Sequence, residues 1–164
     1  MKRIIQTIIC ATLLMLPCYG FSQLGYTSAT DMDVNGIFIG GTYTKTQVTA
    51  TWGTPTQYRS STSETGLDEL YDYSINQINN QLQFNENGVF NTFSIRTPNF
   101  VVYTSFSGGI KVGDNISRIS AIGLGTPVLQ SDGTYHLRRN NSTDPLIFYH
   151  SNGVITRIYF MTSV

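Results

Sequence analysis

Two histidines and their neighbouring acids are the residues of this chain whose types could support hydrolytic chemistry. His136 and His150 are the only histidines, and Asp132 and Asp144 are the acids nearest to them in sequence. A catalytic triad or a metal site would require these side chains to converge. The chain has no Gly-x-Ser-x-Gly, His-Glu-x-x-His or phosphate-binding motif. We therefore predict a non-enzymatic protein with no catalytic residues, and a small hydrolase is the third of our hypotheses.

One acidic stretch has the spacing of a calcium loop. Asp31, Asp33 and Asn35 alternate and are followed by Gly36, as in the first half of such a loop. The position where a calcium loop normally supplies a bidentate acid is occupied by Thr42. Asx-rich turns before glycine are also ordinary turn chemistry. We therefore assign no metal and no cofactor, and keep Asp31, Asp33 and Asn35 as a calcium alternative to be tested by titration.

Aromatic residues offer a different chemistry, that of a protein interface. If Val154, Ile158 and Phe160 face a core, strand alternation places Ile155, Arg157, Tyr159 and Met161 on the opposite face. The matching outward set in an earlier strand is Phe90, Thr92, Ser94 and Arg96. Tyrosine and arginine are enriched at interface centres. The predicted partner-binding residues are Tyr71, Tyr73, Phe90, Tyr149, Ile155, Arg157 and Tyr159. The alternative is that these residues cover a second core face or the seam of a homodimer.

A segment that occurs twice would position these residues. Residues 36–40 and 109–113 have a similar glycine-bounded apolar pattern, and Gly-Thr-Pro follows at 53–55 and 125–127. Between these landmarks, Thr44 and Ser117 are suited to cap short helices that end near residues 52 and 124. Glycine followed by proline is a typical helix stop. The spacing thus predicts one short helix in each half of the chain.

Strand-like runs follow each expected helix. They cover residues 69–75, 82–84 and 89–95 in the first half, and 135–137, 146–149 and 154–160 in the second. Asn87-Gly88 and Asn152-Gly153 separate the last two runs of each half, and Asn-Gly is typical of a type I′ hairpin turn. We predict an α+β fold of two tandem repeats, each a short helix packed on an antiparallel sheet of about three to four strands. The predicted segments are a signal peptide (1–22), a flexible leader (23–35), repeat 1 (36–97), a linker (98–108) and repeat 2 (109–164).

The order of these motifs resembles the β-lactamase inhibitory protein-like superfamily, whose members carry two tandem units. It is also similar to the small outer-membrane-assembly lipoproteins, which carry one such unit. The resemblance covers roughly residues 36–160 and implies two sheets whose open face grips a protein partner. Two features depart from it. The inhibitory proteins typically carry disulfides, and the lipoproteins need a lipidated cysteine, whereas both cysteines here lie at positions 10 and 18.

The first 22 residues indicate export. Lys2 and Arg3 precede an apolar run that is too short for an ordinary membrane span, and Gly20-Phe21-Ser22 fits a signal cleavage site. Cleavage there removes two of ten basic residues and leaves eight against ten acidic ones. This balance argues against a nucleic-acid partner. We expect a periplasmic or extracellular protein that binds an unknown protein partner in an inhibitor-like manner. The alternative is an envelope assembly accessory, membrane-bound only if Cys18 is lipidated.

Overall fold

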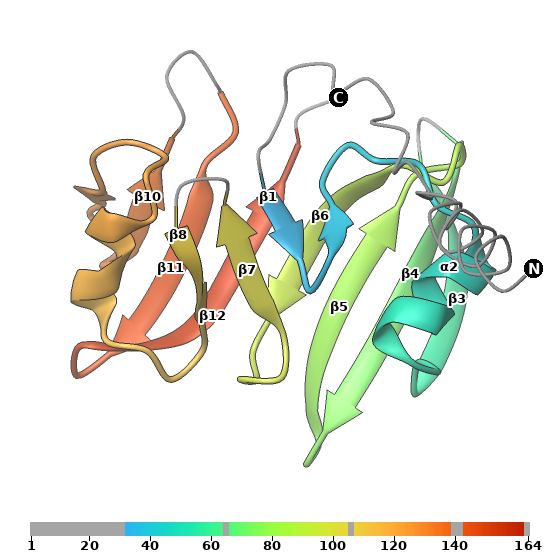
Figure 1. Cartoon of the computed structure of the whole chain (residues 1–164), viewed down its shortest axis with the longest axis horizontal. Helices are drawn as coiled ribbons and strands as arrows, with labels where there is room; N and C mark the ends of the chain where they lie inside the picture. Colours follow the sequence, from blue (N-terminus) through green and yellow to red (C-terminus); the bar gives the residue numbers. More distant parts are fainter. Residues whose placement is uncertain (1–31, 64–65, 105–106, 139–142, 163–164) are drawn as a thin grey trace, which may run out of the picture.

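The computed structural model describes residues 32–63, 66–104, 107–138 and 143–162. The predicted signal peptide, Cys18 and Asp31 therefore lie outside the described residues. Strands account for 51% of the described residues, and they form one sheet of eight strands and another of four. Figure 1 shows the smaller sheet lying in front of the larger one, so the two sheets form separate layers.

Every neighbouring pair in the large sheet is antiparallel. The strands of the first half of the chain meet those of the second half at the pairing between β6 and β12. In spatial order the strands are β3 (Gln57–Ser63), β4 (Gly66–Ile75), β5 (Ile78–Phe84), β6 (Phe90–Ile95), β12 (Val154–Met161), β11 (Leu146–Ser151), β10 (Tyr135–Leu137) and β9 (Val128–Leu129).

The small sheet is built from segments far apart in the sequence. Its strands, in spatial order, are β2 (Ile37–Phe38), β1 (Met32–Val34), β7 (Val101–Thr104) and β8 (Ser107–Lys111). Residues 32–35, which we predicted to belong to a leader, form β1 and the turn after it. The predicted linker at 98–108 contains β7 and the start of β8. These segments thus build a second layer over the first.

Two helical segments occur within the described residues. Helix α2 (Lys45–Trp52) begins at Thr44, as predicted, and Thr44 and Gln47 form a capping box. The second segment is a 3₁₀ helix, η1 (Ile116–Ala121), and its cap is Asn115 rather than the predicted Ser117. The Asn115 side chain accepts a hydrogen bond from the Ser117 backbone N–H at 2.9 Å, which satisfies one of the unpaired donors at the start of the helix.

The predicted fold class is therefore wrong. The protein is mostly β, with antiparallel sheets of four and eight strands, and is not two helix-on-sheet repeats. The strands of the two halves continue into one sheet, and the layer that covers this sheet is largely a second sheet. A binary helix–strand pattern does not show which strands pair across the chain, because that pairing depends on contacts between residues far apart in sequence.

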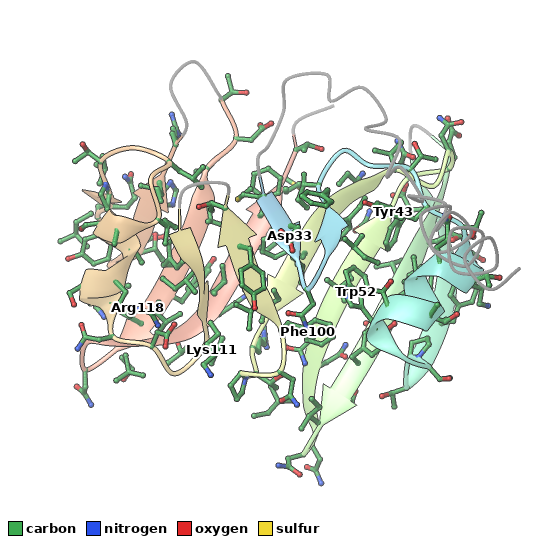
Figure 2. All side chains as sticks on the ribbon, viewed as in Figure 1. Asp33, Tyr43, Trp52, Phe100, Lys111 and Arg118 are labelled. Atoms are coloured by element: carbon green, nitrogen blue, oxygen red, sulfur yellow. The ribbon has the colours of Figure 1, made fainter. Side chains whose placement is uncertain are left out.

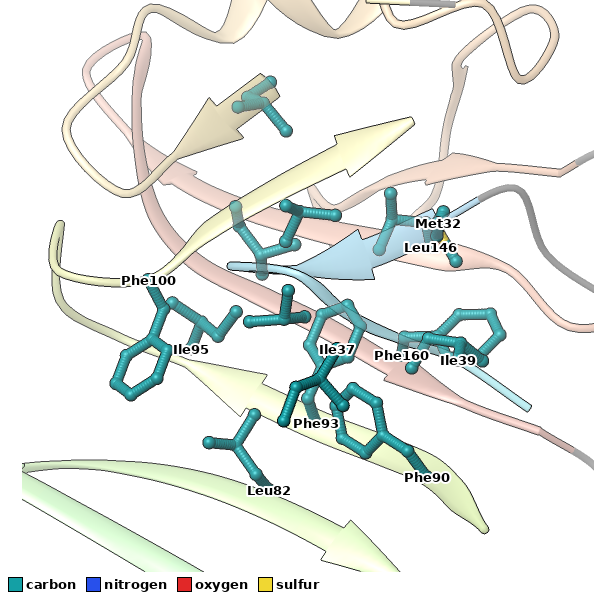
Figure 3. Packing of buried hydrophobic residues seen from close by; sticks show 14 of the residues in the cluster. Met32, Ile37, Ile39, Leu82, Phe90, Phe93, Ile95, Phe100, Leu146 and Phe160 are labelled. Carbon is teal, nitrogen blue, oxygen red and sulfur yellow. The ribbon is translucent and has the colours of Figure 1, made fainter. Parts of the chain in front are cut away.

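A single hydrophobic core fills the space between the layers. Phe93 and Phe160 stack across the β6–β12 seam with their ring centroids 5.8 Å apart. Ile37 and Ile39 of the front layer belong to the same cluster (Figure 3). Trp52 of α2 contributes its ring, and its Nε1 donates to the Val34 carbonyl oxygen at 3.0 Å. The core thus joins α2 and both sheets into one packed unit.

Several hairpin turns use the left-handed backbone region: Asn76-Gln77, between β4 and β5, has φ values of 50° and 66°, and three further turns contain an Asn-Gly pair. Asn152 and Gly153 have φ values of 51° and 78°, as the predicted type I′ turn requires. The hairpin predicted at Asn87-Gly88 also forms, but only Gly88 of that pair has a positive φ. Its hydrogen bond runs from the Gly88 N–H to the Asn85 carbonyl oxygen, which is the pattern of a longer connection. The third pair, Asn35-Gly36, has φ values of 46° and 89° and joins β1 to β2.

Candidate functional site

The eight-stranded sheet has one covered face and one outer face. We use "outer face" for the side opposite α2, η1 and the small sheet. The covered face is apolar: Tyr71, Leu82, Phe93 and Phe160 follow one another across β4, β5, β6 and β12 in register and are buried. On the outer face the neighbouring row is polar, and Met161 is 53% exposed. The outer face is thus the side of this sheet that a partner could reach.

Two of the predicted interface residues, Phe90 and Ile155, lie in the core instead. Both are almost fully buried, at 0% and 1% exposure. In each case a β-bulge is the cause. In β6, Asn91 is an extra residue between the pairs Phe84↔Phe90 and Gln83↔Thr92. In β12, Thr156 is an extra residue between the pairs His150↔Ile155 and Tyr149↔Arg157. An extra residue reverses the alternation of side chains before it, so both side chains turn inward.

Tyr71 and Tyr73 share a face of β4, as predicted, but it is the covered face, where both are buried. The Tyr71 and Tyr58 hydroxyls donate to the two carboxylate oxygens of Glu69, at 3.0 Å and 2.6 Å. Lys45 Nζ lies 3.4 Å from the centroid of the Tyr58 ring. The Tyr73 hydroxyl donates to the Gly53 carbonyl oxygen. These tyrosines therefore hold α2 and β3 to the sheet and are not available to a partner.

Their surroundings predict an alkaline limit to stability. Burial raises the pKa of Tyr58 to about 12, helped by the hydrogen bond and negative charge of Glu69, and burial alone raises the pKa of Tyr73 to about 12. The folded state thus keeps protons that the unfolded chain, with ordinary tyrosine pKa values near 10, loses. We expect the free energy of unfolding to fall as the pH rises from 10 towards 12. Denaturation followed by circular dichroism measures this fall, and Tyr58→Phe should reduce its slope; an unchanged slope would contradict the assignment.

On the β3–β5 half of the outer face, the charged groups are already paired with one another. Asp72 is buried, and its carboxylate accepts hydrogen bonds from Arg59 Nε at 2.8 Å and from Asn79 Nδ2 at 2.8 Å. Arg59 Nη2 lies 2.6 Å from the same carboxylate. Gln83 similarly donates to Asp68 at 2.8 Å. This half of the face therefore consists of a closed polar network with its acceptors satisfied from within.

The other half of the outer face carries the remaining predicted residues together. Tyr149 and Arg157 are direct cross-strand neighbours on β11 and β12, and Tyr159 lies two residues beyond Arg157. The Arg157 guanidinium carbon lies 5.0 Å from the centroid of each tyrosine ring. Its Nε donates to Ser94 Oγ on β6 at 2.9 Å. We call Tyr149, Arg157 and Tyr159 the arginine–tyrosine cluster; all three side chains are half-buried.

This geometry holds the arginine in place and leaves part of it for a ligand. Cation–π contact with each ring contributes roughly 0.5–1 kcal/mol at an exposed site. The hydrogen bond to Ser94 holds the Arg157 guanidinium from a third direction. The contacts of the guanidinium within the described residues use Nε and the ring faces. Nη1 and Nη2 therefore remain as donors in the fork that matches a carboxylate. Met161 lies close by, within 3.4 Å of the Tyr159 hydroxyl, and provides apolar surface.

The two histidines, His136 and His150, do not converge on one site. His136 pairs with Ile147 on the outer face, whereas His150 pairs with buried Ile155. The centroid of the His150 ring lies 5.5 Å from that of Tyr135. The described residues contain no group of three or more histidine, cysteine or acidic side chains placed to hold a metal ion. The Asp33 carboxylate accepts a hydrogen bond from the Gly36 N–H. The Asp132 carboxylate accepts hydrogen bonds from Thr134, which lower the pKa of Asp132.

Asn35, the third calcium candidate, has a structural role. Its amide oxygen accepts from the Val101 N–H at 2.9 Å and its amide nitrogen donates to the Asn99 carbonyl oxygen at 3.1 Å. These bonds fasten the β1–β2 turn to β7. The Asn35 side chain is thus used to fix this turn.

Comparisons with known proteins add no further candidates. No family model, curated protein or solved structure matches this chain. Within the described residues, the helices are too short and too polar to cross a lipid bilayer. The arginine–tyrosine cluster therefore rests on its own geometry.

Two members of the site were visible in the sequence but not selected. Ser94 and Arg96 belong to the outward set of β6, and the structure places Ser94 against Arg157. Strand alternation identified their face correctly, but nothing in the sequence indicated that β6 and β12 are neighbours. A selection limited to aromatic residues and their immediate neighbours therefore missed them.

Proposed function

We propose that this protein is a non-enzymatic protein-binding module that uses the outer face of its large sheet around the arginine–tyrosine cluster. The observation that carries the proposal is the Arg157 guanidinium, held between Tyr149 and Tyr159 on an accessible sheet face. Tyrosine and arginine are the residue types that dominate binding energy at interfaces.

The arrangement favours binding because its parts are already ordered. A side chain that is fixed before binding loses less entropy when the complex forms. Arg157 is fixed by two rings and by the Ser94 hydroxyl, and all four residues belong to the paired strands β6, β12 and β11. On the β3–β5 half of the outer face, by contrast, the Asp72 and Asp68 carboxylates are bonded to neighbouring side chains. The cluster is therefore the part of the sheet best suited to a partner.

Site-specific photo-crosslinking tests this proposal. A photoreactive amino acid replaces Met161, which is 53% exposed beside the cluster, or Tyr103, which is 38% exposed on the small sheet. The native cell expresses the full chain with this replacement, and the exported protein is then irradiated. We expect a crosslinked partner from position 161 and not from position 103. The combined Tyr149→Ala and Tyr159→Ala substitutions should weaken the purified complex at least about tenfold, since interface tyrosines commonly contribute over 1.4 kcal/mol each.

Tyr103 provides the matched control. Tyr103→Ala removes the same side chain from the other layer of the protein and should leave the affinity unchanged. Crosslinks of equal yield from both positions, or an affinity unaffected by the double substitution, would contradict the proposal. A product of twice the mass of the exported chain would identify the partner as a second copy of the chain.

A further inference from the structure

Two arginines occupy neighbouring positions where β6 and β12 meet. The last printed pair of these strands is Ile95 with Ile158. Arg96 directly follows β6, and continuing the antiparallel register by one position places its backbone opposite that of Arg157. Arg96 is exposed, and its backbone N–H donates to the buried Asn80 amide oxygen at 2.8 Å. Both arginines thus start from rigid backbone positions at the seam of the sheet.

This pair has no compensating acid nearby. Neither Arg96 nor Arg157 forms an ion pair with any residue that the structure describes. The described acids of β4 on the same face, Asp68 and Asp72, lie two strands from β6 and are already bonded to Gln83 and Arg59. Like charges directly opposite on neighbouring strands destabilise a sheet. An anion bound between the two guanidinium groups would remove this repulsion.

We propose that Arg96 and Arg157 bind a carboxylate of an acidic segment in the partner protein. This inference rests on the proposed function, because it names the chemistry of the partner at the same face. One carboxylate can accept hydrogen bonds from the fork of Arg157 while the positive charge of Arg96 adds attraction. Tyr149 and Tyr159 flank the carboxylate, and Met161 contacts apolar atoms of the residue next to it.

The surroundings favour an acidic protein over a polyanion such as nucleic acid. Binding to a phosphate backbone draws on a long row of cations. Here two arginines are set among tyrosines, Met161 and the partly buried Ile147. The chain as a whole has ten basic and ten acidic residues, so no general positive field supports polyanion binding. A single carboxylate bordered by apolar groups matches this mixture.

The test uses the full chain and a defined probe. A fluorescent peptide with glutamates spaced by leucine and threonine is compared with a peptide in which every glutamate is glutamine. Fluorescence polarisation at low salt gives the two dissociation constants. We expect the glutamate peptide to bind at least about tenfold more tightly, and added salt to remove most of the difference.

Arginine variants locate the effect. Arg96→Gln and Arg157→Gln should each weaken binding of the glutamate peptide about tenfold, as for loss of one charged hydrogen-bonded partner. Lys111→Gln makes the same change of charge at an exposed position of β8 in the front layer (Figure 2) and should have no effect. Circular dichroism confirms that each variant is folded; exposed Arg96 keeps the test decisive if Arg157→Gln is unstable.

Three results would overturn the inference: equal affinity for the two peptides, unchanged affinity of both arginine variants, or inorganic polyphosphate binding more tightly than the glutamate peptide. The outcome is separable from that of the proposed function. If the tyrosine double variant loses its crosslinked partner while Arg96→Gln and Arg157→Gln retain it, the face binds protein but not through a carboxylate. If the tyrosine variant also retains the partner, the proposed function itself is wrong.

Discussion

Replacing Trp52 with alanine is expected to lower the free energy of unfolding by about 3–5 kcal/mol, the usual cost of removing a large aromatic side chain from a core. The Trp52 ring lies 5.4–6.3 Å, centroid to centroid, from four other rings, those of Phe90, Phe100, Phe84 and Tyr73. Through Trp52, α2 contacts both sheets, because its Nε1 also donates to Val34 of β1. Figure 2 shows Trp52 and Phe100 side by side in the front layer.

Urea unfolding followed by far-ultraviolet circular dichroism measures this loss, because Trp52 is the only tryptophan and its fluorescence disappears with it. Trp52→Phe is the matched control. It keeps an aromatic ring and removes the indole N–H, so we expect a cost nearer 1–2 kcal/mol from the unpaired Val34 carbonyl oxygen and the smaller ring. If alanine and phenylalanine cost the same, the ring contacts do not carry the stability and this account of the core is wrong.

Asn80→Ala is expected to cost about 2–5 kcal/mol, although it removes only a small polar side chain. Asn80 is fully buried, and its amide oxygen accepts hydrogen bonds from the backbone N–H groups of Arg96 and Thr97, at 2.8 Å and 3.0 Å. Its amide nitrogen donates to the Tyr73 carbonyl oxygen at 2.9 Å. Alanine would leave these buried groups without a partner, and each such group costs roughly 1–3 kcal/mol.

The neighbouring Asn79 provides the matched control. It is exposed, on the same strand, and bonds to Asp72 and Ser74 through side chains only. Asn79→Ala should cost less than Asn80→Ala, because Asp72 keeps its bond to Arg59 and no buried backbone group loses its partner. Similar costs at the two positions, measured by urea unfolding, would contradict the role of Asn80. Because Asn80 holds the backbone of Arg96, its loss should also weaken binding of the glutamate peptide.

Local structure was predictable where the signal lies within a few residues. The cap at Thr44, the Asn152-Gly153 turn and the strand runs around Phe93 and Ile158 all follow from short-range chemistry, and the structure confirms them. Pairing between distant strands was not predictable in this way. The contact of β6 with β12 joins residues more than sixty positions apart, and no turn residue or alternation pattern encodes it.

The same limit explains the small sheet. Its outer strands are short, and β8 contains Gly108 and Gly109, so the sequence of β8 is typical of a linker. Gly109 is required because Tyr103 of β7 lies over it: an added Cβ would come within 2.8 Å of that ring. A glycine chosen for close approach to a neighbouring strand cannot be distinguished, from sequence alone, from a glycine chosen for a turn.

The candidate site was predicted in part for a comparable reason. Alternation correctly placed Arg157 and Tyr159 on an outward face, with Tyr149 beside them. It failed for Phe90 and Ile155, because the bulges at Asn91 and Thr156 add a residue that no periodic rule anticipates. Tyr71 and Tyr73 were correctly placed on one face of their strand, but whether that face is covered depends on the packing of α2, which is a tertiary contact.

The position of β12 in the sheet has a consequence for the integrity of the sheet. Among the described residues β12 is the last strand in sequence, yet it is an interior one, between β6 and β11 (Figure 1). Until β12 has formed, β6 therefore has an unpaired edge. A protease that removed β12 would separate β6 from β11 and divide the sheet in its interior, because β12 is the strand that joins the two halves.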